Sequence, residues 1–435
     1  MTGRERELRA LTDAVRRLVR ASVVSAPTAD ETARIAADVR RVADDLRTFV
    51  PTDAVVRYAG ETDTAPNVHA GAPYDVIHGL YSPLAPPLRM SSQGRTAVGE
   101  VTFDTPYEGP PGFVHGAVLA GCFDMVLGAA NRLEGPAGPT VRLFTRYRRP
   151  TRLHQPCRFE AEFDRLDGRR IHTVGRVVQN GEVTVECEGS FAHLTRERID
   201  TLASRGASPR RDGREDRSPH LNQPGGAFRA SGHPAVAGRE VPLRALADSV
   251  RDLIELTVTH VADAAATVPL ATRVNDLAAA LERHEVVPPF SRYGGTELDG
   301  HPHDFFPFDP VLGLYNPLAL PIRVEWNAPL ATGRAWFTTP YEGPPGCVHG
   351  AVIAGGFDQV CNVANIRSGV AGPTRTLDVT YRRPTRLDRE VVFEAWVESV
   401  QGRDVTTRAV IRQGDQVTCE AVGVFVALPG GTPPG

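Results

Sequence analysis

A long internal repeat constrains this chain more than any other feature of its sequence. Residues 106–115 read PYEGPPGFVH, and residues 340–349, which lie 234 positions later, read PYEGPPGCVH. The same offset aligns residues 74–191 with residues 308–425 without a gap. Self-similarity at one fixed interval indicates a structural unit that is used twice. The 435 residues therefore contain two copies of one domain.

Each copy is preceded by a helical stretch that repeats more weakly. LRALTDAVRRLVR at residues 8–20 resembles LRALADSVRDLIE at residues 243–255. The segment between the copies is rich in Arg, Asp, Ser, Gly and Pro, so it cannot bury enough apolar surface to order itself. We expect a helical segment over 1–60, a first domain over 61–195, a flexible linker over 196–238, a second helical segment over 239–290 and a second domain over 291–430.

The pattern within one repeat predicts one helix and several antiparallel strands. Residues 116–131 (GAVLAGCFDMVLGAAN) have the length of a helix and are apolar on every side, which predicts a helix that is buried all round. Alternating apolar runs with Asp-Gly and Asn-Gly turns between them predict strands at 98–103, 140–148, 157–166, 170–179 and 183–193. An antiparallel sheet wrapped around a buried helix is the hot-dog fold. We therefore expect an α+β tandem double hot-dog.

Composition excludes several classes of function. The 49 basic and 52 acidic residues leave a formal charge of −3, so the chain lacks the excess of positive charge that is typical of nucleic-acid-binding proteins. All of the basic residues are arginine, so a Schiff-base lysine, a pyridoxal phosphate attachment and a P-loop are excluded. No stretch approaches the roughly 18 apolar residues of a membrane span. We expect no nucleic-acid partner and no membrane association.

The N-terminus and the cysteines favour a cytoplasmic protein. MTGRERELRA lacks the apolar core of a signal peptide. The six cysteines form no CxxC pair and do not match between the repeats, so we expect reduced thiols and no metal site. They are Cys122, Cys157, Cys187, Cys347, Cys361 and Cys419.

One aspartate in each predicted helix is a candidate catalytic residue. Asp124 is the only charged residue within 116–131, and Asp358 is the only one within the matching 350–365. Burying a carboxylate costs several kcal/mol unless it is paired or protonated, so an aspartate without a role is unexpected there. We expect a nucleophile or general base in a dry pocket. The alternative is an aspartate that faces a strand arginine or caps a backbone group.

A histidine and a glycine stand where each of these helices begins. The unpaired N–H groups of a helix start favour developing negative charge, so the N–H of Gly116 or Gly350 could polarise a carbonyl oxygen. His115 and His349 precede these glycines. The alternative for the histidines is that they end the loop and hydrogen-bond its backbone.

The spacing of histidine and aspartate predicts sites shared between the repeats. Nine residues along an α-helix correspond to about 13.5 Å of rise and about 900° of rotation, which puts the two side chains on opposite faces. One helix therefore cannot bring its own pair together. If they share a site, the histidine comes from one repeat and the aspartate from the other, which predicts two composite sites related by a pseudo-two-fold axis.

An arginine-rich motif, YRRPTR, ends a predicted strand in both repeats. It places Arg148 and Arg149 in the first repeat and Arg382 and Arg383 in the second. Guanidinium groups at a strand end can bind phosphate oxygens in a forked geometry. The alternative is a solvated strand terminus.

Taken together, GPPGFVHGAVLAGCFD and TVRLFTRYRRPTRL resemble the PaaI-type acyl-CoA thioesterases of the hot-dog superfamily, which include animal members with a GPPGFVHGG motif. The resemblance covers the two repeats but not the helical prefaces or the linker. It implies hydrolysis of an acyl-CoA thioester with no cofactor other than the coenzyme A of the substrate, and sites at the interface of two hot-dog units.

The resemblance also implies roles for individual residues. Asp124 and Asp358 would act as nucleophile or base, and Gly116 and Gly350, beside His115 and His349, would supply the oxyanion N–H. A Thr sixteen residues after each aspartate, Thr140 and Thr374, would help to place the water, and Arg148, Arg149, Arg382 and Arg383 would meet the CoA phosphates. A homodimer of double hot-dogs is expected at family level. Both repeats read HGA instead of HGG, which leaves the size of the substrate open.

Two other functions fit the same fold. A non-catalytic protein that binds acyl-CoA or an aromatic ligand is one, because hot-dog domains also serve without turnover. An enoyl-CoA hydratase is the other, but that family places Asp before His at close spacing, whereas here His precedes Asp. The acyl group itself cannot be read from the sequence.

Overall fold

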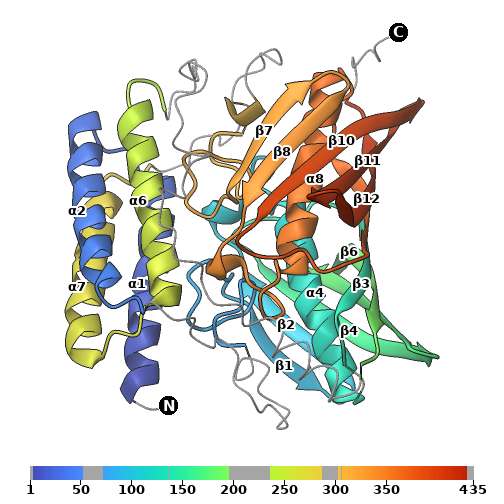
Figure 1. The fold of residues 1–435 in the computed structure, drawn as a ribbon, viewed down its shortest axis with the longest axis horizontal. Coiled ribbons are helices and arrows are strands. Elements are labelled where there is room, and N and C mark those ends of the chain that lie inside the picture. The colour runs from blue at the N-terminus through green and yellow to red at the C-terminus, as the bar shows by residue number, and fades with distance from the viewer. Residues whose placement is uncertain are drawn as a thin grey trace.

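Twelve antiparallel strands form one continuous sheet that wraps around two central helices (Figure 1). The computed structural model describes residues 3–51, 72–135, 137–194, 236–286, 302–304 and 306–428. The strand order is β1-β2-β4-β5-β6-β3-β9-β12-β11-β10-β8-β7, so each repeat contributes one half of the sheet. The predicted α+β double hot-dog is confirmed.

The elements of the two repeats correspond one to one. The first contains β1 (Arg89–Gln93), β2 (Thr96–Thr102), η1 (Thr105–Tyr107), α4 (Gly116–Leu133), β3 (Thr140–Tyr147), β4 (Pro156–Asp167), β5 (Arg170–Gln179) and β6 (Glu182–Ala192). The second contains β7 (Ile322–Asn327), β8 (Leu330–Trp336), η3 (Thr339–Tyr341), α8 (Gly350–Arg367), β9 (Thr374–Tyr381), β10 (Glu390–Gln401), β11 (Asp404–Gln413) and β12 (Gln416–Val426), with a short η2 (Pro302–Asp304) before them. The edge strands β1 and β7 were not predicted. β1 is mostly exposed and shows no apolar alternation, whereas β7 does alternate, with Ile322 and Val324 buried.

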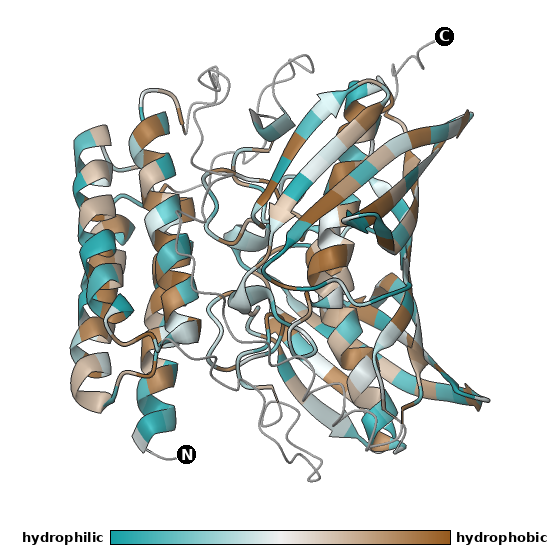
Figure 2. Cartoon of the chain, in the orientation of Figure 1, coloured by the Kyte–Doolittle hydropathy of each residue, from teal (hydrophilic) through white to brown (hydrophobic). Residues whose placement is uncertain are grey.

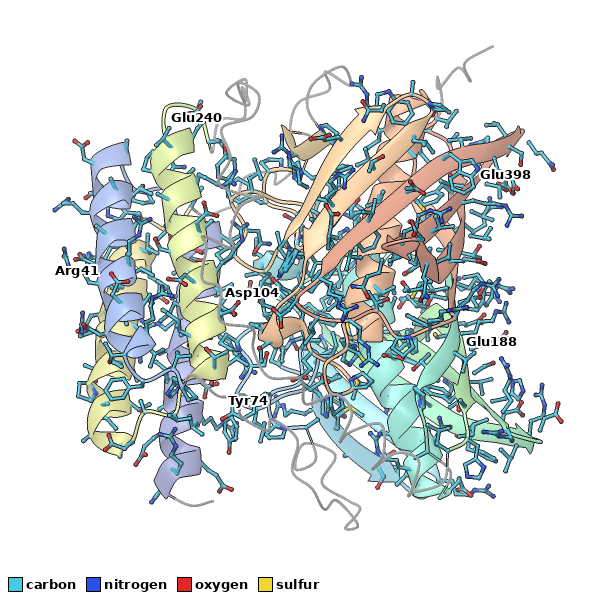
Figure 3. The ribbon with its side chains drawn as sticks, in the orientation of Figure 1. Arg41, Tyr74, Asp104, Glu188, Glu240 and Glu398 are labelled. Atoms are coloured by element: carbon cyan, nitrogen blue, oxygen red, sulfur yellow. The ribbon has the colours of Figure 1, made fainter. Side chains whose placement is uncertain are left out.

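The repeats join where β3 pairs with β9. Phe144 lies opposite Asp378, and the pairing runs antiparallel from there in both directions. Arg142 donates to both carboxylate oxygens of Asp378, at 2.8 and 2.6 Å. The outer face of the sheet carries charged side chains, among them Glu188 and Glu398 (Figure 3). This seam fixes the relative position of the two repeats.

The central helices α4 and α8 pack against each other in antiparallel fashion. A Cβ added at Gly121 would lie 3.2 Å from the methyl of Ala351, and one added at Gly355 would lie 3.4 Å from the methyl of Ala117. The alanines of the two HGA motifs therefore fill the space that glycines leave on the opposite helix. The methyl groups serve packing between the helices, and both alanines are buried.

The helical prefaces form a four-helix layer beside the double hot-dog (Figure 1). Its members are α1 (Gly3–Val24), α2 (Ala29–Arg47), α6 (Glu240–Thr259) and α7 (Ala264–Glu282). Each preface is thus two helices, which pack crosswise with those of the other repeat: α1 lies on α7, and α2 lies on α6. Their inner faces are hydrophobic (Figure 2), and Arg17 on α1 pairs with Glu282 on α7.

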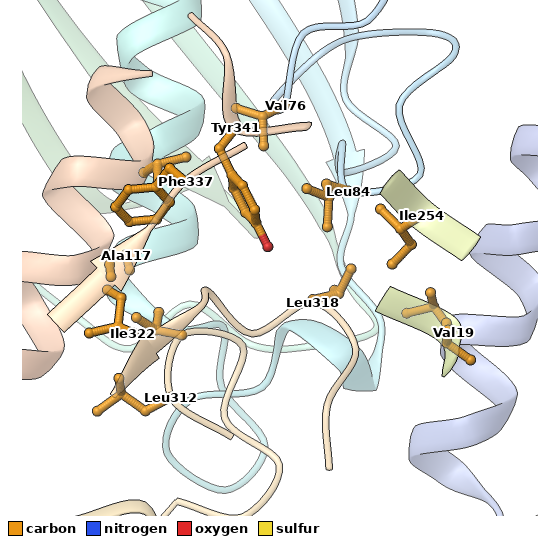
Figure 4. Packing of buried hydrophobic residues seen from close by; sticks show 14 of the residues in the cluster. Val19, Val76, Leu84, Ala117, Ile254, Leu312, Leu318, Ile322, Phe337 and Tyr341 are labelled. Atoms are coloured by element: carbon orange, nitrogen blue, oxygen red, sulfur yellow. The ribbon is translucent and has the colours of Figure 1, made fainter. Parts of the chain in front are cut away.

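The four-helix layer is attached to the hot-dog units by a mixed interface. Figure 4 shows Val19 and Ile254 of the layer facing Leu84 and Leu318 of the loops before the sheet. Polar contacts add to this, since Arg20 of α1 pairs with Asp104, which lies between the layer and the strands (Figure 3).

Two half-buried arginines tie the layer to loops that precede β1 and β7. Arg16 of α1 donates to the carbonyl oxygens of Gly79 and Ser82, at 3.0 and 2.9 Å. Its counterpart Arg251 of α6 donates to three carbonyls of the matching loop. These arginines fix the backbone of both loops, which carry residues of the candidate sites.

Some expectations fall on other parts of the chain. Most of the predicted linker, residues 196–235, lies outside the described residues, as do residues 429–435. None of the helices within the described ranges combines the length and the apolar character that a bilayer span requires.

Candidate active site

The loop before each central helix is shaped to present a histidine at the first turn. Gly112 has φ 82°, a left-handed conformation that favours glycine, and its N–H donates to Glu108 at 2.7 Å. A Cβ at Gly109 would lie 2.8 Å from Cα of His115, so only glycine lets the loop pass so close. The second repeat matches these features. The PYEGPPG segment is thus a rigid support for the helix start.

The structure brings each histidine to the aspartate of the other repeat. His115 Nδ1 lies 3.9 Å from Asp358 Oδ2, and His349 Nδ1 lies 3.7 Å from Asp124 Oδ2. All four side chains are buried. We call the site at the start of α4 the α4 site and the one at the start of α8 the α8 site. Both are composite, as the nine-residue spacing predicts.

The two threonines hold the aspartates by one oxygen only. Thr140 donates to Asp124 Oδ1 at 2.6 Å, and Thr374 donates to Asp358 Oδ1 at 2.8 Å. Among the described residues, no donor reaches Oδ2 of either aspartate. A Cβ at Gly350 would lie 3.3 Å from Asp124 Oδ2, so the free oxygen faces the start of α8. It is therefore available to a water molecule there.

The first N–H of each central helix has no acceptor within the described part of the chain. This is the usual state of a helix start, where the N–H groups and the helix dipole attract negative charge. The start of each central helix thus lies beside a free carboxylate oxygen of the opposite repeat. Each site can hold a developing oxyanion and a base at the same time.

The histidines cap their helices. Nδ1 of His115 accepts from the N–H of Ala117 at 3.0 Å, and Nδ1 of His349 accepts from Ala351 at 3.0 Å. The alternative of a histidine that hydrogen-bonds the backbone is therefore realised. Because Nδ1 accepts, the ring proton is assigned to Nε2.

A second aspartate in each site was not found from the sequence. Nε2 of His115 lies 3.1 Å from Asp309 Oδ2, and Nε2 of His349 lies 3.1 Å from Asp75 Oδ2. The other oxygen of each of these aspartates accepts two backbone N–H groups of its own loop. Asp75 and Asp309 lie in the loops that Arg16 and Arg251 fix. The signal was present, because PYDVIHG and PFDPVLG repeat the aspartate at the same offset.

The two sites differ beside this second aspartate. In the α4 site, the side-chain amide of Gln359 donates to Asp309 Oδ2 at 2.7 Å and lies 2.7 Å from Nε2 of His115. The matching residue of the α8 site is Met125. In the α8 site the additional polar neighbour of the second aspartate is His78, whose Nδ1 lies 2.8 Å from Asp75 Oδ1.

The environment shifts the pKa of Asp124, Asp358 and Asp75. Burial raises the pKa of Asp124 and Asp358 above the ordinary value, although the facing histidine and the threonine hydrogen bond oppose the rise. For Asp75 burial acts in the same direction, but His349 and His78 outweigh it and hold its pKa well below the ordinary value. The α8 site therefore pairs a proton-accepting aspartate, Asp124, with a firmly ionised one, Asp75.

The strand-end motif is joined to the helix start by its tyrosine. Tyr147 donates to the carbonyl oxygen of Gly116 at 2.9 Å, and Tyr381 donates to that of Gly350 at 2.9 Å. The arginines that follow are exposed. Three of them pair with glutamates: Arg148 with Glu186, Arg149 with Glu182 and Arg382 with Glu420.

Arg383 has no such partner among the described residues. Its counterpart Arg149 lines a surface pocket of about 310 Å³, together with Phe113 and Arg152. Phosphate binding by these arginines stays a prediction. Among the residues that the structure describes, no three His, Cys, Asp or Glu side chains gather as a metal site would require.

Sequence comparison identifies the family. The model of the thioesterase superfamily matches residues 111–196 and 345–420, once in each repeat and across both central helices. A thioesterase superfamily protein of known structure is 34% identical over 42% of this chain and 94% of its own length, with a TM-score of 0.39. Residues 111–196 and 345–420 are therefore thioesterase superfamily domains.

Curated members of the superfamily match part of the chain. The acyl-coenzyme A thioesterase THEM4 of Xenopus laevis is 35% identical over 92 residues, which are 20% of this chain and 41% of the relative. The mouse (Mus musculus) protein of the same name is 34% identical over 89 residues, which are 20% of this chain and 38% of the relative. The chain thus spans about two fifths of these relatives.

The opposite pKa shifts predict opposite stability effects of two similar substitutions. Because the pKa of Asp124 is raised on folding, its ionised form destabilises the fold above that pKa, so Asp124→Asn should raise the melting temperature at pH 7 by a few degrees. The gain should shrink as the pH falls and the wild-type carboxyl takes up its proton. The pKa of Asp75 is lowered, so its charge stabilises the fold above the unfolded-state pKa, and Asp75→Asn should lower the melting temperature at pH 7. Calorimetry of both variants checks this, and shifts of equal sign would contradict the assignment.

Proposed function

We infer that the chain hydrolyses acyl-CoA thioesters at two composite sites. The observation that carries this inference is the free Oδ2 of Asp124 beside the start of α8, where the N–H of Gly350 has no acceptor among the described residues. Asp358 lies beside the start of α4 in the same way. A base and an oxyanion donor placed together are what addition of water to a carbonyl needs. The names of the THEM4 relatives support acyl-CoA as the substrate.

The reaction follows from this placement. A water molecule held by the free oxygen of Asp124 loses a proton to the carboxylate while its oxygen attacks the thioester carbonyl. The carbonyl electrons move to the oxygen, which the N–H of Gly350 stabilises. When the tetrahedral intermediate collapses, the C–S bond breaks, and the proton returns from the carboxyl to the departing CoA sulfur. Direct attack by the carboxylate, followed by hydrolysis of the anhydride, gives the same products.

The remaining residues of the site hold these groups in place. Thr140 fixes the carboxylate, and His349 fixes the helix start through its bond to Ala351. Asp75 holds His349 from the far side. Since the base acts ionised, the rate should rise with pH through the raised pKa of Asp124 and then level off.

The proposal also covers the binding of the CoA portion, the need for a cofactor, the oligomeric state and the location. The arginines after Tyr147 and Tyr381 suit the phosphates of CoA, since both tyrosines join the strand end to the helix start. No cofactor besides substrate CoA is needed for this chemistry. A dimer of two chains and a cytoplasmic location remain predictions.

A panel of thioesters tests this function. Acetyl-, hexanoyl-, palmitoyl- and phenylacetyl-CoA are incubated with the full chain, and released thiol is followed with a chromogenic disulfide. We expect turnover of at least one substrate well above the uncatalysed rate. A folded chain that binds acyl-CoA tightly in calorimetry but releases no thiol would replace this proposal with a ligand-binding role.

A further inference from the structure

The face of α4 that carries Asp124 continues differently from the same face of α8. Residues four apart lie one above the other on a helix, so Gly128 and Arg132 follow Asp124 on one face. In α8 the corresponding positions after Asp358 hold Asn362 and Ile366. The α8 site is therefore extended by a glycine and a cation, and the α4 site by an amide and an aliphatic side chain.

Gly128 leaves room beside the α8 site. A Cβ at this position would meet only one atom within 4 Å, Nη1 of Arg132 at 3.8 Å. The side chain of Arg132 thus runs back along the helix, as long helical side chains do. Its guanidinium lies about one helical turn from Asp124, close to 6 Å along the axis.

The side chain of Arg132 forms no hydrogen bond and no ion pair within the described part of the chain. Arg95, at the same end of α4, binds Glu134 with both Nε and Nη2. Arg132 is exposed. The protein around it lowers its pKa, against the opposing pull of Asp75, so the guanidinium lies within electrostatic reach of the α8 site. An exposed, unpaired cation at the border of the α8 site is suited to bind an anion.

The α4 site offers no such cation at the matching position. Ile366 is 7% exposed and packs in a small apolar cluster with Phe306 and Ala371. Asn362 donates to Oε1 of Gln359 at 3.3 Å, which extends the polar contacts around Asp309. The two sites therefore present different surroundings to an acyl group, although their catalytic residues match.

We propose that the α8 site accepts short acyl groups that end in a carboxylate, and that Arg132 binds this carboxylate. The proposal rests on the thioesterase function proposed above. The acyl group would extend from the carbonyl at Gly350 and Asp124 over Gly128 to the guanidinium. A separation of about one helical turn fits a dicarboxylic acyl group of four or five carbons, such as succinyl or glutaryl.

The test compares two substrates of equal chain length, glutaryl-CoA and pentanoyl-CoA, which differ in the terminal carboxylate. Asp358→Asn disables the α4 site and leaves the α8 site to be measured alone; Asp124→Asn does the reverse. The readout is the ratio of kcat/KM for glutaryl-CoA to that for pentanoyl-CoA, so a general loss of activity cancels.

In the Asp358→Asn chain, Arg132→Met should lower this ratio about 10- to 100-fold, the usual effect of losing a hydrogen-bonded charge pair, and Arg132→Lys should restore part of it. In the Asp124→Asn chain, the ratio should not respond to Arg132→Met. Arg95→Met removes a charge from the same helix end without facing the site and serves as the matched control. A ratio that Arg132→Met leaves unchanged in the Asp358→Asn chain overturns the proposal.

A binding measurement separates failure of this proposal from failure of the thioesterase function. Two stable thioethers, S-(4-carboxybutyl)-CoA and S-pentyl-CoA, are titrated into the wild type and Arg132→Met by calorimetry. If the wild type hydrolyses no thioester, the thioesterase function fails, and the binding ratio still decides the role of Arg132. A preference for the carboxylate ligand that disappears in Arg132→Met supports the proposal; equal preference in both proteins overturns it.

Discussion

Replacing both Asp124 and Asp358 with asparagine is expected to lower kcat/KM for the best acyl-CoA substrate by about 10²- to 10⁴-fold, the usual contribution of a positioned base. Asparagine keeps the shape and can still accept from Thr140 or Thr374, but it cannot take a proton from water. The loss should appear in kcat, because neither aspartate is needed to bind the CoA portion.

The single variants show whether both sites work. Because each aspartate serves the helix start of the other repeat, Asp124→Asn should disable only the α8 site, and Asp358→Asn only the α4 site. With a substrate that both sites accept, each single variant should retain a substantial part of the activity. The melting temperature and circular dichroism serve as controls for folding. A double variant with wild-type kcat would exclude these aspartates as bases or nucleophiles.

The sequence predicted the fold and the pairing between repeats because both follow from regular geometry. An apolar helix with one charge, a nine-residue separation from histidine to aspartate and a fixed offset together require a composite arrangement. The structure places His115 beside Asp358 and His349 beside Asp124 accordingly. No long-range information was needed beyond the repeat itself.

The second aspartates were not predicted because their role depends on tertiary contacts. Asp75 lies in a loop, where no helical or strand period relates it to His349, far along the chain. The loop takes its position from Gly79, where a Cβ would lie 2.4 Å from the backbone N of Asp75, and from Arg16 of α1. The helical prefaces, whose function the sequence left open, thus support the loops that hold the histidines. These contacts join residues far apart in the sequence, so only the three-dimensional structure reveals them.

The two repeats place different side chains around sites whose candidate catalytic residues match. Both sites keep histidine, glycine, threonine and two aspartates, but Gln359 stands where the other repeat has Met125, and Ile366 where it has Arg132. These positions lie on the same helices as the candidate catalytic aspartates Asp124 and Asp358. In a chain with two sites, the side chains around one site can therefore change while those around the other site stay the same.

Removing the N–H of Gly350 is expected to lower kcat of the α8 site about 10²- to 10³-fold, the effect of losing one oxyanion donor. Gly350→Pro achieves this without disturbing the helix, since proline is favoured at the first helical position and this N–H has no acceptor among the described residues. His349, with φ −62° and ψ 138°, already has the conformation that a residue before proline requires.

The matched control is Gly350→Ala, which adds a Cβ 3.3 Å from Asp124 Oδ2 but keeps the N–H. Both variants are measured in the Asp358→Asn chain, so that only the α8 site contributes. The steric effect of Cβ is shared by the two variants, and the further loss in the proline variant reports the replacement of the N–H by the ring Cδ. If alanine and proline reduce kcat equally while both chains melt like the parent, the helix start does not stabilise the oxyanion, and the donor must be sought elsewhere in the site.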